Sequence, residues 1–231
     1  MHFYLTQTPV ATATRQPTAM PTATPMPTAT PASASPSSPL FTSLPVESTT
    51  VMQGYGPTTY ARDTWQAWYS GTSGLHAGLD IAAPVGAQVT AGLDGEVIGY
   101  WMPDGTKKGV SVGQTWPDAH TNIAGTVVGA VFVRAGNKIV TYGHVKPSDN
   151  LQLGPVKANT VLGTIADMDD SHLHLSIFEE TTPYTFHNPY SFMTPNIQQS
   201  LRFKGNEYPP GFGPESVSQI RAGGQNYWQN Q

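Results

Sequence analysis

The chain has 231 residues, and only 11% of them are charged, whereas a typical globular protein has about 25%. Its 23 glycines and 21 prolines exclude a long coiled coil or a compact helix bundle, because both architectures need many helix formers and few helix breakers. The net charge of −4 and the scattered lysines and arginines argue against nucleic acid as a partner. No run of about 20 apolar residues forms a transmembrane segment, and the absence of cysteine excludes disulfides and thiolate metal sites.

Residues 1–49 are predicted to form a disordered linker or stalk rich in Pro, Thr, Ala and Ser. Between residues 7 and 40 these four residue types occupy 27 of 34 positions. Such a segment cannot bury enough apolar surface to offset the entropy lost on ordering. We expect an extracellular or cell-envelope location, because linkers of this composition are commonest outside the cell. The first ten residues show neither the basic start nor the apolar centre of a signal peptide.

Residues 50–195 are predicted to form the folded domain, a mainly β, antiparallel β-sheet domain with long loops. Short alternating runs lie between clusters of Gly, Pro, Asn and Asp, and no stretch keeps an apolar period of 3.6 residues. Residues 131–134 and 138–142 read as a hairpin around a Gly-Asn turn, and an Asp94-Gly95 turn precedes a strand over residues 96–100. The polar residues 196–231 are expected to form a coil or an arm wrapped on the domain.

Two histidines alternate with apolar residues between Ser171 and Ile177. In an extended strand, the leucines and Ile177 share one face, and His172, His174 and Ser176 share the other. Two imidazoles placed in this way can bind one metal ion together, or one can bind while the other works beside it. The alternative is a polar strand face whose histidines have no joint role.

Two further segments carry histidines in patterns that suggest a site. His76 and Asp80 are four residues apart, an even spacing that puts both on one face of an extended chain. Imidazole and carboxylate are the ligands that zinc accepts in the absence of cysteine. His144 follows Tyr142 and Gly143 at the end of the predicted hairpin, where a histidine can equally be a structural residue.

Taken in order, these three segments resemble the lysostaphin-type (LytM-like) zinc endopeptidases, which cut the peptide part of bacterial cell walls. That family is marked by a HxGxD segment running into a strand, a YxH segment at a hairpin end and a later HxH strand. The corresponding segments here are 76–80, 142–144 and 172–174, and the resemblance covers about residues 50–193.

The resemblance implies roles for five residues. His76, Asp80 and His174 would bind Zn2+ and leave one coordination position open for water. His144 and His172 would flank that water, one taking its proton and the other stabilising the oxyanion, and the sequence does not say which does which. The implied substrate is a peptide bond in peptidoglycan, in a cross-bridge or between stem peptides.

Three features depart from the family pattern. Residues 101–129 read as a long insertion in a hairpin that is usually shorter, and the loop over residues 166–171 is acidic where a glycine-rich loop is usual. After the HxH segment, Leu175 and Ser176 stand where an aromatic residue and Glu are common. These departures concern the substrate and the loop shapes more than the metal site.

Several other residues have more than one interpretation. Five aromatic residues before the first predicted ligand either line a substrate groove or pack a loop: Tyr55, Tyr60, Trp65, Trp68 and Tyr69. Three acidic residues either contact a substrate amine, orient a ligand histidine or form a solvated turn: Asp167, Asp169 and Asp170. His120 and His187 are expected to be structural or surface residues, and His2 falls in the predicted stalk.

The sequence therefore predicts a zinc metalloendopeptidase that acts on peptidoglycan. The alternative is a non-catalytic LytM-like adaptor or cell-wall-binding module that regulates other wall hydrolases, as relatives without the full set of ligands do. All five positions are filled here, which favours the enzyme. An insertion or a C-terminal arm that covers the site would favour the adaptor.

Overall fold

The computed structural model describes residues 38–64, 69–109, 128–181, 183–204, 207–223 and 225–230. Most of the predicted stalk and of the predicted insertion lie outside the described residues, as do Trp65, Trp68 and His120. The interpretations of those segments therefore remain predictions. Within the described part of the chain, no helix has the length and apolar character needed to cross a membrane.

Short strands dominate the described residues, as the mainly β prediction requires. They are β1 (Thr50–Gln53), β2 (Gly78–Ala82), β3 (Gln88–Thr90), β4 (Gly95–Trp101), β5 (Lys107–Gly109), β6 (Ala130–Ala135), β7 (Lys138–Gly143), β8 (Val145–Pro147), β9 (Gly154–Val156), β10 (Val161–Ile165), β11 (His172–Glu179), β12 (Thr185–His187), β13 (Arg202–Phe203) and β14 (Gln219–Arg221). The described helices are short: α1 (Thr59–Thr64), η2 (Ser70–Thr72), η3 (Pro189–Phe192), α2 (Pro195–Ser200) and η4 (Tyr227–Asn230).

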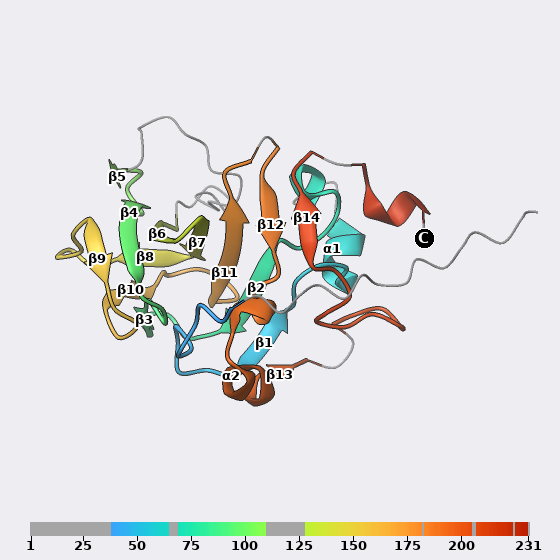
Figure 1. Cartoon of the computed structure of the whole chain (residues 1–231), viewed down its shortest axis with the longest axis horizontal. Helices are drawn as coiled ribbons and strands as arrows, with labels where there is room; N and C mark the ends of the chain where they lie inside the picture. Colours follow the sequence, from blue (N-terminus) through green and yellow to red (C-terminus); the bar gives the residue numbers. More distant parts are fainter. Residues whose placement is uncertain are drawn as a thin grey trace, which may run out of the picture. The chain divides into compact units, whose positions relative to one another are not determined.

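One large sheet carries most of these strands, in the order β13-β1-β2-β11-β7-β6-β4-β5. In Figure 1, β11 stands near its middle, with β12 and β14 continuing on one side. A smaller sheet has the order β3-β10-β8. The strand pairs are antiparallel, as predicted, except for β1 and β13, which run parallel.

The predicted hairpin is confirmed. β6 and β7 pair from Ala130 opposite Gly143 to Ala135 opposite Lys138, which leaves a two-residue turn of Gly136 and Asn137. Gly136 has a φ of 63°, a left-handed conformation that glycine adopts without steric cost. The strand predicted after Asp94-Gly95 is also present, as β4.

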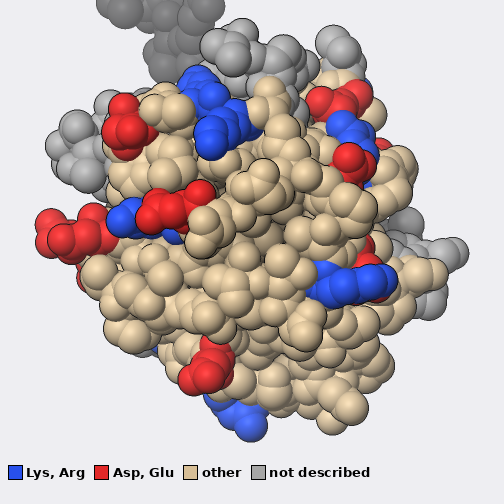
Figure 2. All heavy atoms as spheres, turned by 90° about the vertical axis from the view of Figure 1, so that its left-hand side faces the viewer, with Lys and Arg blue, Asp and Glu red and all other residues tan. Residues whose placement is uncertain are grey.

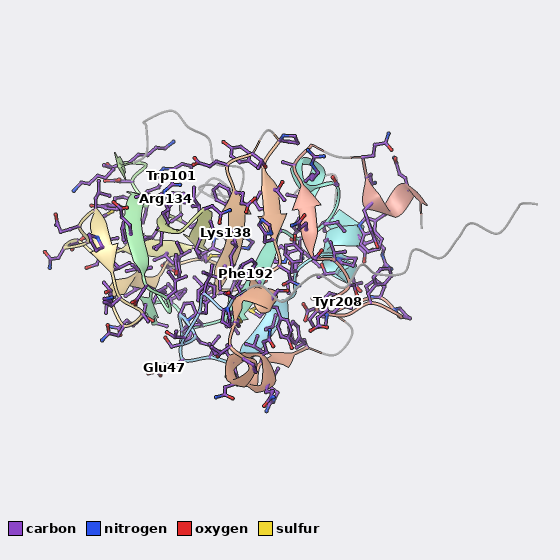
Figure 3. All side chains as sticks on the ribbon, in the orientation of Figure 1. Glu47, Trp101, Arg134, Lys138, Phe192 and Tyr208 are labelled. Atoms are coloured by element: carbon purple, nitrogen blue, oxygen red, sulfur yellow. The ribbon has the colours of Figure 1, made fainter. Side chains whose placement is uncertain are left out.

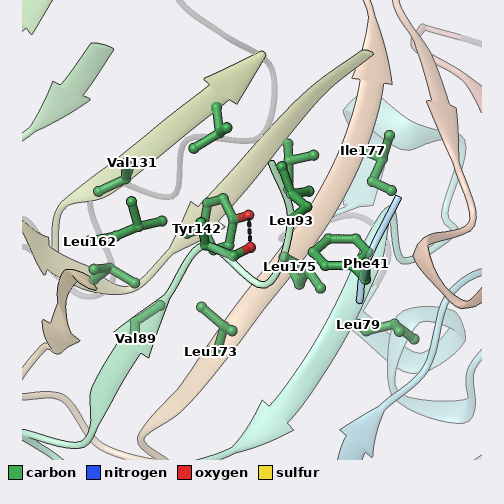
Figure 4. Close-up of a cluster of buried hydrophobic side chains, with 14 of the residues drawn as sticks. Phe41, Leu79, Val89, Leu93, Val131, Tyr142, Leu162, Leu173, Leu175 and Ile177 are labelled. Carbon is green, nitrogen blue, oxygen red and sulfur yellow. Dashed lines mark hydrogen bonds between the residues drawn. The ribbon is translucent and has the colours of Figure 1, made fainter. Parts of the chain in front are cut away.

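The core lies on the apolar face of the large sheet. Leu173, Leu175 and Ile177 of β11 are fully buried, as the alternating pattern predicted, and Leu79 of β2 packs with them (Figure 4). Each such side chain contributes about 1.5–3 kcal/mol when it leaves water. Tyr142 is buried beside them, and its hydroxyl donates a hydrogen bond to the carbonyl of Ala91. The polar face of the same strands is thereby fixed on the opposite side.

Segments outside residues 50–195 also contribute to this core. Phe41 is fully buried, and its N–H and that of Leu40 donate to the carbonyl of Phe192. Near the other end, Ile220 of β14 is buried where that strand pairs with β12. Packing therefore begins before residue 50, and the C-terminal arm lies against the domain.

The surface shown in Figure 2 carries few charges. Acidic and basic side chains are scattered among uncharged residues on that face. The labelled residues Arg134 and Lys138 in Figure 3 belong to β6 and β7 and pair with Glu180 and Glu179. Mixed pairs of this kind produce no broad field of one sign.

Candidate metal centre

Pairing of β2 with β11 places Asp80 directly opposite His174. Because Leu79 and Leu175 face the core, the intervening Asp80 and His174 point to the other face of the sheet. His76 lies just before β2, where a bridge between His76 and Gly56 holds the chain. Three side chains that the sequence singled out are thus brought together from two segments.

These three residues form a compact triangle of ligand atoms. His174 Nδ1 lies 2.8 Å from Asp80 Oδ1 and 3.2 Å from His76 Nε2, and His76 Nε2 lies 3.4 Å from Asp80 Oδ1. All three residues are buried, with His76 and His174 each 2% exposed. The group is a candidate metal site.

The triangle has the dimensions that zinc requires. Four-coordinate zinc with bonds of about 2.0–2.1 Å holds neighbouring ligand atoms about 3.3 Å apart. Two of the observed separations, 3.2 and 3.4 Å, lie close to this value, and the third, 2.8 Å between His174 Nδ1 and Asp80 Oδ1, is about 0.5 Å shorter. His174 Nδ1 is the ring nitrogen that faces both Asp80 and His76, so a neutral His174 protonated on Nε2 would offer its lone pair at the centre of the triangle.

Contacts with the backbone fix both candidate ligand histidines. His76 Nδ1 donates to the carbonyl of Gly54 at 2.7 Å, so the lone pair of a neutral His76 sits on Nε2 and faces the other ligands. A Cβ at Gly78 would lie 2.6 Å from His174 Cε1 and 2.7 Å from Nε2. The glycine between His76 and Asp80 is therefore required to admit the His174 ring.

The electrostatics of Asp80 favour its charged form. Burial by itself raises the pKa of Asp80. The neighbouring His76 and His172 and the hydrogen bonds from His174 and His76 outweigh burial, so the pKa lies well below its ordinary value. Asp80 is an anion at neutral pH, as a metal ligand must be.

His144 and His172 lie beside the triangle. The ring of His144 is 4.6 Å from that of His172 and 6.0 Å from that of His174, measured between centroids. His172 Nε2 lies 3.6 Å from Asp80 Oδ1, while its Nδ1 donates to the carbonyl of Asp170 at 2.5 Å. A neutral His172 thus presents an unprotonated Nε2 to the site.

His144 has an unusual backbone. Its φ is 62°, a left-handed value that costs a non-glycine residue energy and occurs preferentially at functional sites. The residue ends the β6–β7 hairpin, one position after Gly143, which pairs with His174. The structure thus brings together all five predicted site residues.

The other candidate residues have different roles. Tyr69 lies beside the site, with its ring centroid 5.8 Å from that of His76 and its hydroxyl donating to Gln53. Tyr55 is buried and donates to the carbonyl of Phe186, and Tyr60 is 54% exposed. Asp170 orients His172 through its backbone carbonyl, whereas Asp167 and Asp169 are exposed. His187 is buried near Glu179 and Phe192.

Sequence reasoning missed several residues around the site. Gly54 supplies the carbonyl for His76, and Gln53 lies opposite Asp80 and donates to Thr58. Glu207, from the C-terminal arm, contacts the position that a Gly54 side chain would occupy. No local pattern indicates these residues, because each reaches the site through strand pairing or through a distant segment.

The chain is structurally similar to several M23 peptidases at low sequence identity. It matches Csd3 of Helicobacter pylori at 21% identity with a TM-score of 0.43, over 68% of this chain and 34% of Csd3. It matches lysostaphin at 17% identity with a TM-score of 0.41, over 71% of this chain and 56% of lysostaphin. It matches the catalytic domain of the prophage-encoded M23 protein EnpA from Enterococcus faecalis at 19% identity with a TM-score of 0.39, over 66% of this chain and 94% of that domain.

The matched region spans about a third of Csd3 and just over half of lysostaphin. No protein-family model matches the sequence, and no curated protein matches it either.

Proposed function

We propose that the chain is a zinc-dependent endopeptidase that hydrolyses peptide bonds in bacterial peptidoglycan, in a cross-bridge or a stem peptide. The observation that carries this proposal is the buried triangle of His76 Nε2, Asp80 Oδ1 and His174 Nδ1. Two imidazoles and one carboxylate leave a bound zinc with a charge of +1 and an open position, the arrangement of catalytic zinc sites. The substrate class comes from the order of the HxGxD, YxH and HxH segments.

The surrounding residues are suited to hydrolysis. When bound, zinc lowers the pKa of its water to about 7 and polarises a carbonyl. His172 accepts the proton of the attacking water at Nε2, since its Nδ1 is already committed to Asp170. His144, packed against the His172 ring, stabilises the oxyanion that develops on the substrate. Action on the cell wall is consistent with an extracellular or cell-envelope location.

Zinc content is the first test. Protein purified without chelator is expected to contain about one zinc per chain. His174→Ala should lose the zinc, whereas His144→Ala should keep it. His187→Ala is the matched control, because His187 is a buried histidine with neighbours of its own. Equal zinc content in His174→Ala and the wild-type chain would refute the ligand assignment.

Hydrolysis of purified peptidoglycan is the second test. The wild-type chain is expected to release new amino groups in a reaction that a chelator stops and zinc restores. His144→Ala and His172→Ala should lose this activity while they retain zinc. Full turnover by His144→Ala would contradict its role. A zinc-loaded chain that binds peptidoglycan without cutting it would instead support the adaptor.

A further inference from the structure

Glu207 is a buried acid that the proposed reaction does not use. The residue is 9% exposed, and among the residues that the structure describes neither of its carboxylate oxygens has a hydrogen-bond partner. A buried, unpaired carboxyl group is costly, and native proteins rarely keep one without a function. Glu207 also lies beyond residues 50–193, so the resemblance to the zinc endopeptidases assigns it no role.

The C-terminal arm holds Glu207 against the backbone that supports the first ligand. β13 pairs with β1, and the Thr59 N–H then donates to the carbonyl of Glu207 at 2.8 Å. The next residue, Tyr208, donates its hydroxyl to the carbonyl of Tyr55 at 3.2 Å. Tyr208 is labelled in Figure 3 on the segment that follows β13. The arm is therefore anchored on both sides of the acid.

Gly54 lies between Glu207 and His76. Glu207 Oε1 lies 2.6 Å from the position that a Cβ on Gly54 would occupy. The carbonyl of the same Gly54 accepts the hydrogen bond from His76 Nδ1. Glu207 and the first ligand thus contact the same residue at the end of β1.

Glu207 also interacts electrostatically with Asp80, the second candidate ligand. Burial, and then repulsion from Asp80, raise the pKa of Glu207 to about 8, with Lys204 opposing them. In the metal-free protein, burial and the negative charge of Asp80 therefore both disfavour the charged form of Glu207. A cation between the ligands would reverse this interaction from repulsive to attractive.

We propose that Glu207 is a positioning residue of the metal centre, which stabilises bound zinc through its negative charge and through its contact with the Gly54 backbone that orients His76. This inference rests on the proposed zinc site. Zinc with one carboxylate and two neutral imidazoles carries a net charge of +1, and the Glu207 carboxylate offsets that charge from outside the ligand set. The C-terminal arm is therefore part of the site and not merely a cover for the sheet edge.

The test compares metal affinity with the stability of the metal-free protein. Glu207→Gln keeps the size of the side chain and removes its charge, and Glu207→Met also removes the unpaired polar group. Glu215→Gln is the matched control, because Glu215 is an exposed acid on the same arm. Zinc affinity is measured by competition with a chromogenic chelator at pH 7.5, and thermal unfolding is measured in excess chelator.

Zinc affinity and the metal-free unfolding midpoint should respond differently to the Glu207 substitutions. Both Glu207 variants are expected to bind zinc about 10–100-fold more weakly than the wild-type chain, the usual effect of losing an outer-shell partner. Their metal-free unfolding midpoints should stay equal or rise, since the Glu207 carboxylate makes no hydrogen bond to the described part of the chain. Glu215→Gln should change neither quantity.

A merely structural role predicts another result. If the midpoints and the affinity fall together, Glu207 supports the fold, and the proposal is overturned. Zinc affinity of Glu207→Gln within two-fold of the wild-type value also overturns it and leaves the zinc enzyme intact. A wild-type chain that binds no zinc overturns both the site and the role of Glu207.

Discussion

Replacement of Gly78 by alanine tests the geometry of the metal centre most directly. The added Cβ would lie 2.6 Å from His174 Cε1, 2.7 Å from His174 Nε2 and 2.8 Å from the carbonyl oxygen of Leu175. Ordinary contacts of this kind begin at 3.4 Å. Because one of the three atoms belongs to the backbone of β11, a rotation of the His174 ring cannot relieve all of the overlap. Strands β2 and β11 must therefore separate, even if the His174 ring also moves.

The required displacement is larger than the proposed zinc site would tolerate. Each contact is short by roughly 0.6–0.8 Å, whereas ligand distances in a metal site hold to within about 0.2 Å. We expect Gly78→Ala to weaken zinc binding at least about ten-fold. Overpacking of this size costs about 1–3 kcal/mol of unfolding free energy. For a chain of this length, that cost lowers the unfolding midpoint by about 2–4 °C per kcal/mol.

Chelator competition and thermal unfolding with excess chelator measure the two effects separately. Gly213→Ala is the control, since a Cβ at Gly213 would meet no atom of the described residues within 4 Å. Wild-type zinc affinity together with a wild-type midpoint in Gly78→Ala would refute the close approach of the His174 ring to β2.

Three further predictions concern stability. Zinc at 100 times its Kd should raise the unfolding free energy by about 2.7 kcal/mol, and a thermal shift that chelator does not reverse would contradict a specific site. The folded chain holds the Glu207 proton up to about pH 8, whereas the unfolded chain releases it near pH 4.5. The unfolding free energy of the metal-free protein should therefore fall as the pH rises from about 4.5 to about 8. This fall has a slope of up to about 1.4 kcal/mol per pH unit, and it should be absent when the unfolding free energy of Glu207→Gln is measured by urea titration. Tyr142→Phe leaves the buried Ala91 carbonyl without its donor and should cost about 1–3 kcal/mol in the same titrations with zinc content unchanged.

The structure of the C-terminal arm could not be predicted from the sequence. Residues 196–231 are polar, and their composition allows either a coil or a wrapped arm. The structure places β13 beside β1 and β14 beside β12, and Ile220 enters the core. Such pairings depend on which edges the rest of the sheet leaves open, and a local pattern of polar and apolar residues does not encode that.

The alternation of residue types predicts which side chains share a strand face. In an extended chain, side chains alternate every residue, so the spacing alone put His172 and His174 opposite the core leucines. The tight Gly-Asn turn and the hairpin around it were likewise local and predictable.

The way the candidate ligands meet depends on long-range strand pairing. Asp80 and His174 are 94 residues apart, and they touch because β2 and β11 pair in one particular register. A shift of one residue would turn these side chains toward the core. That register is set by burial of the apolar face across the whole sheet, and the same packing brings Gly54 and Glu207 to the site. The residue types of the site follow from the sequence, and their arrangement follows from long-range packing.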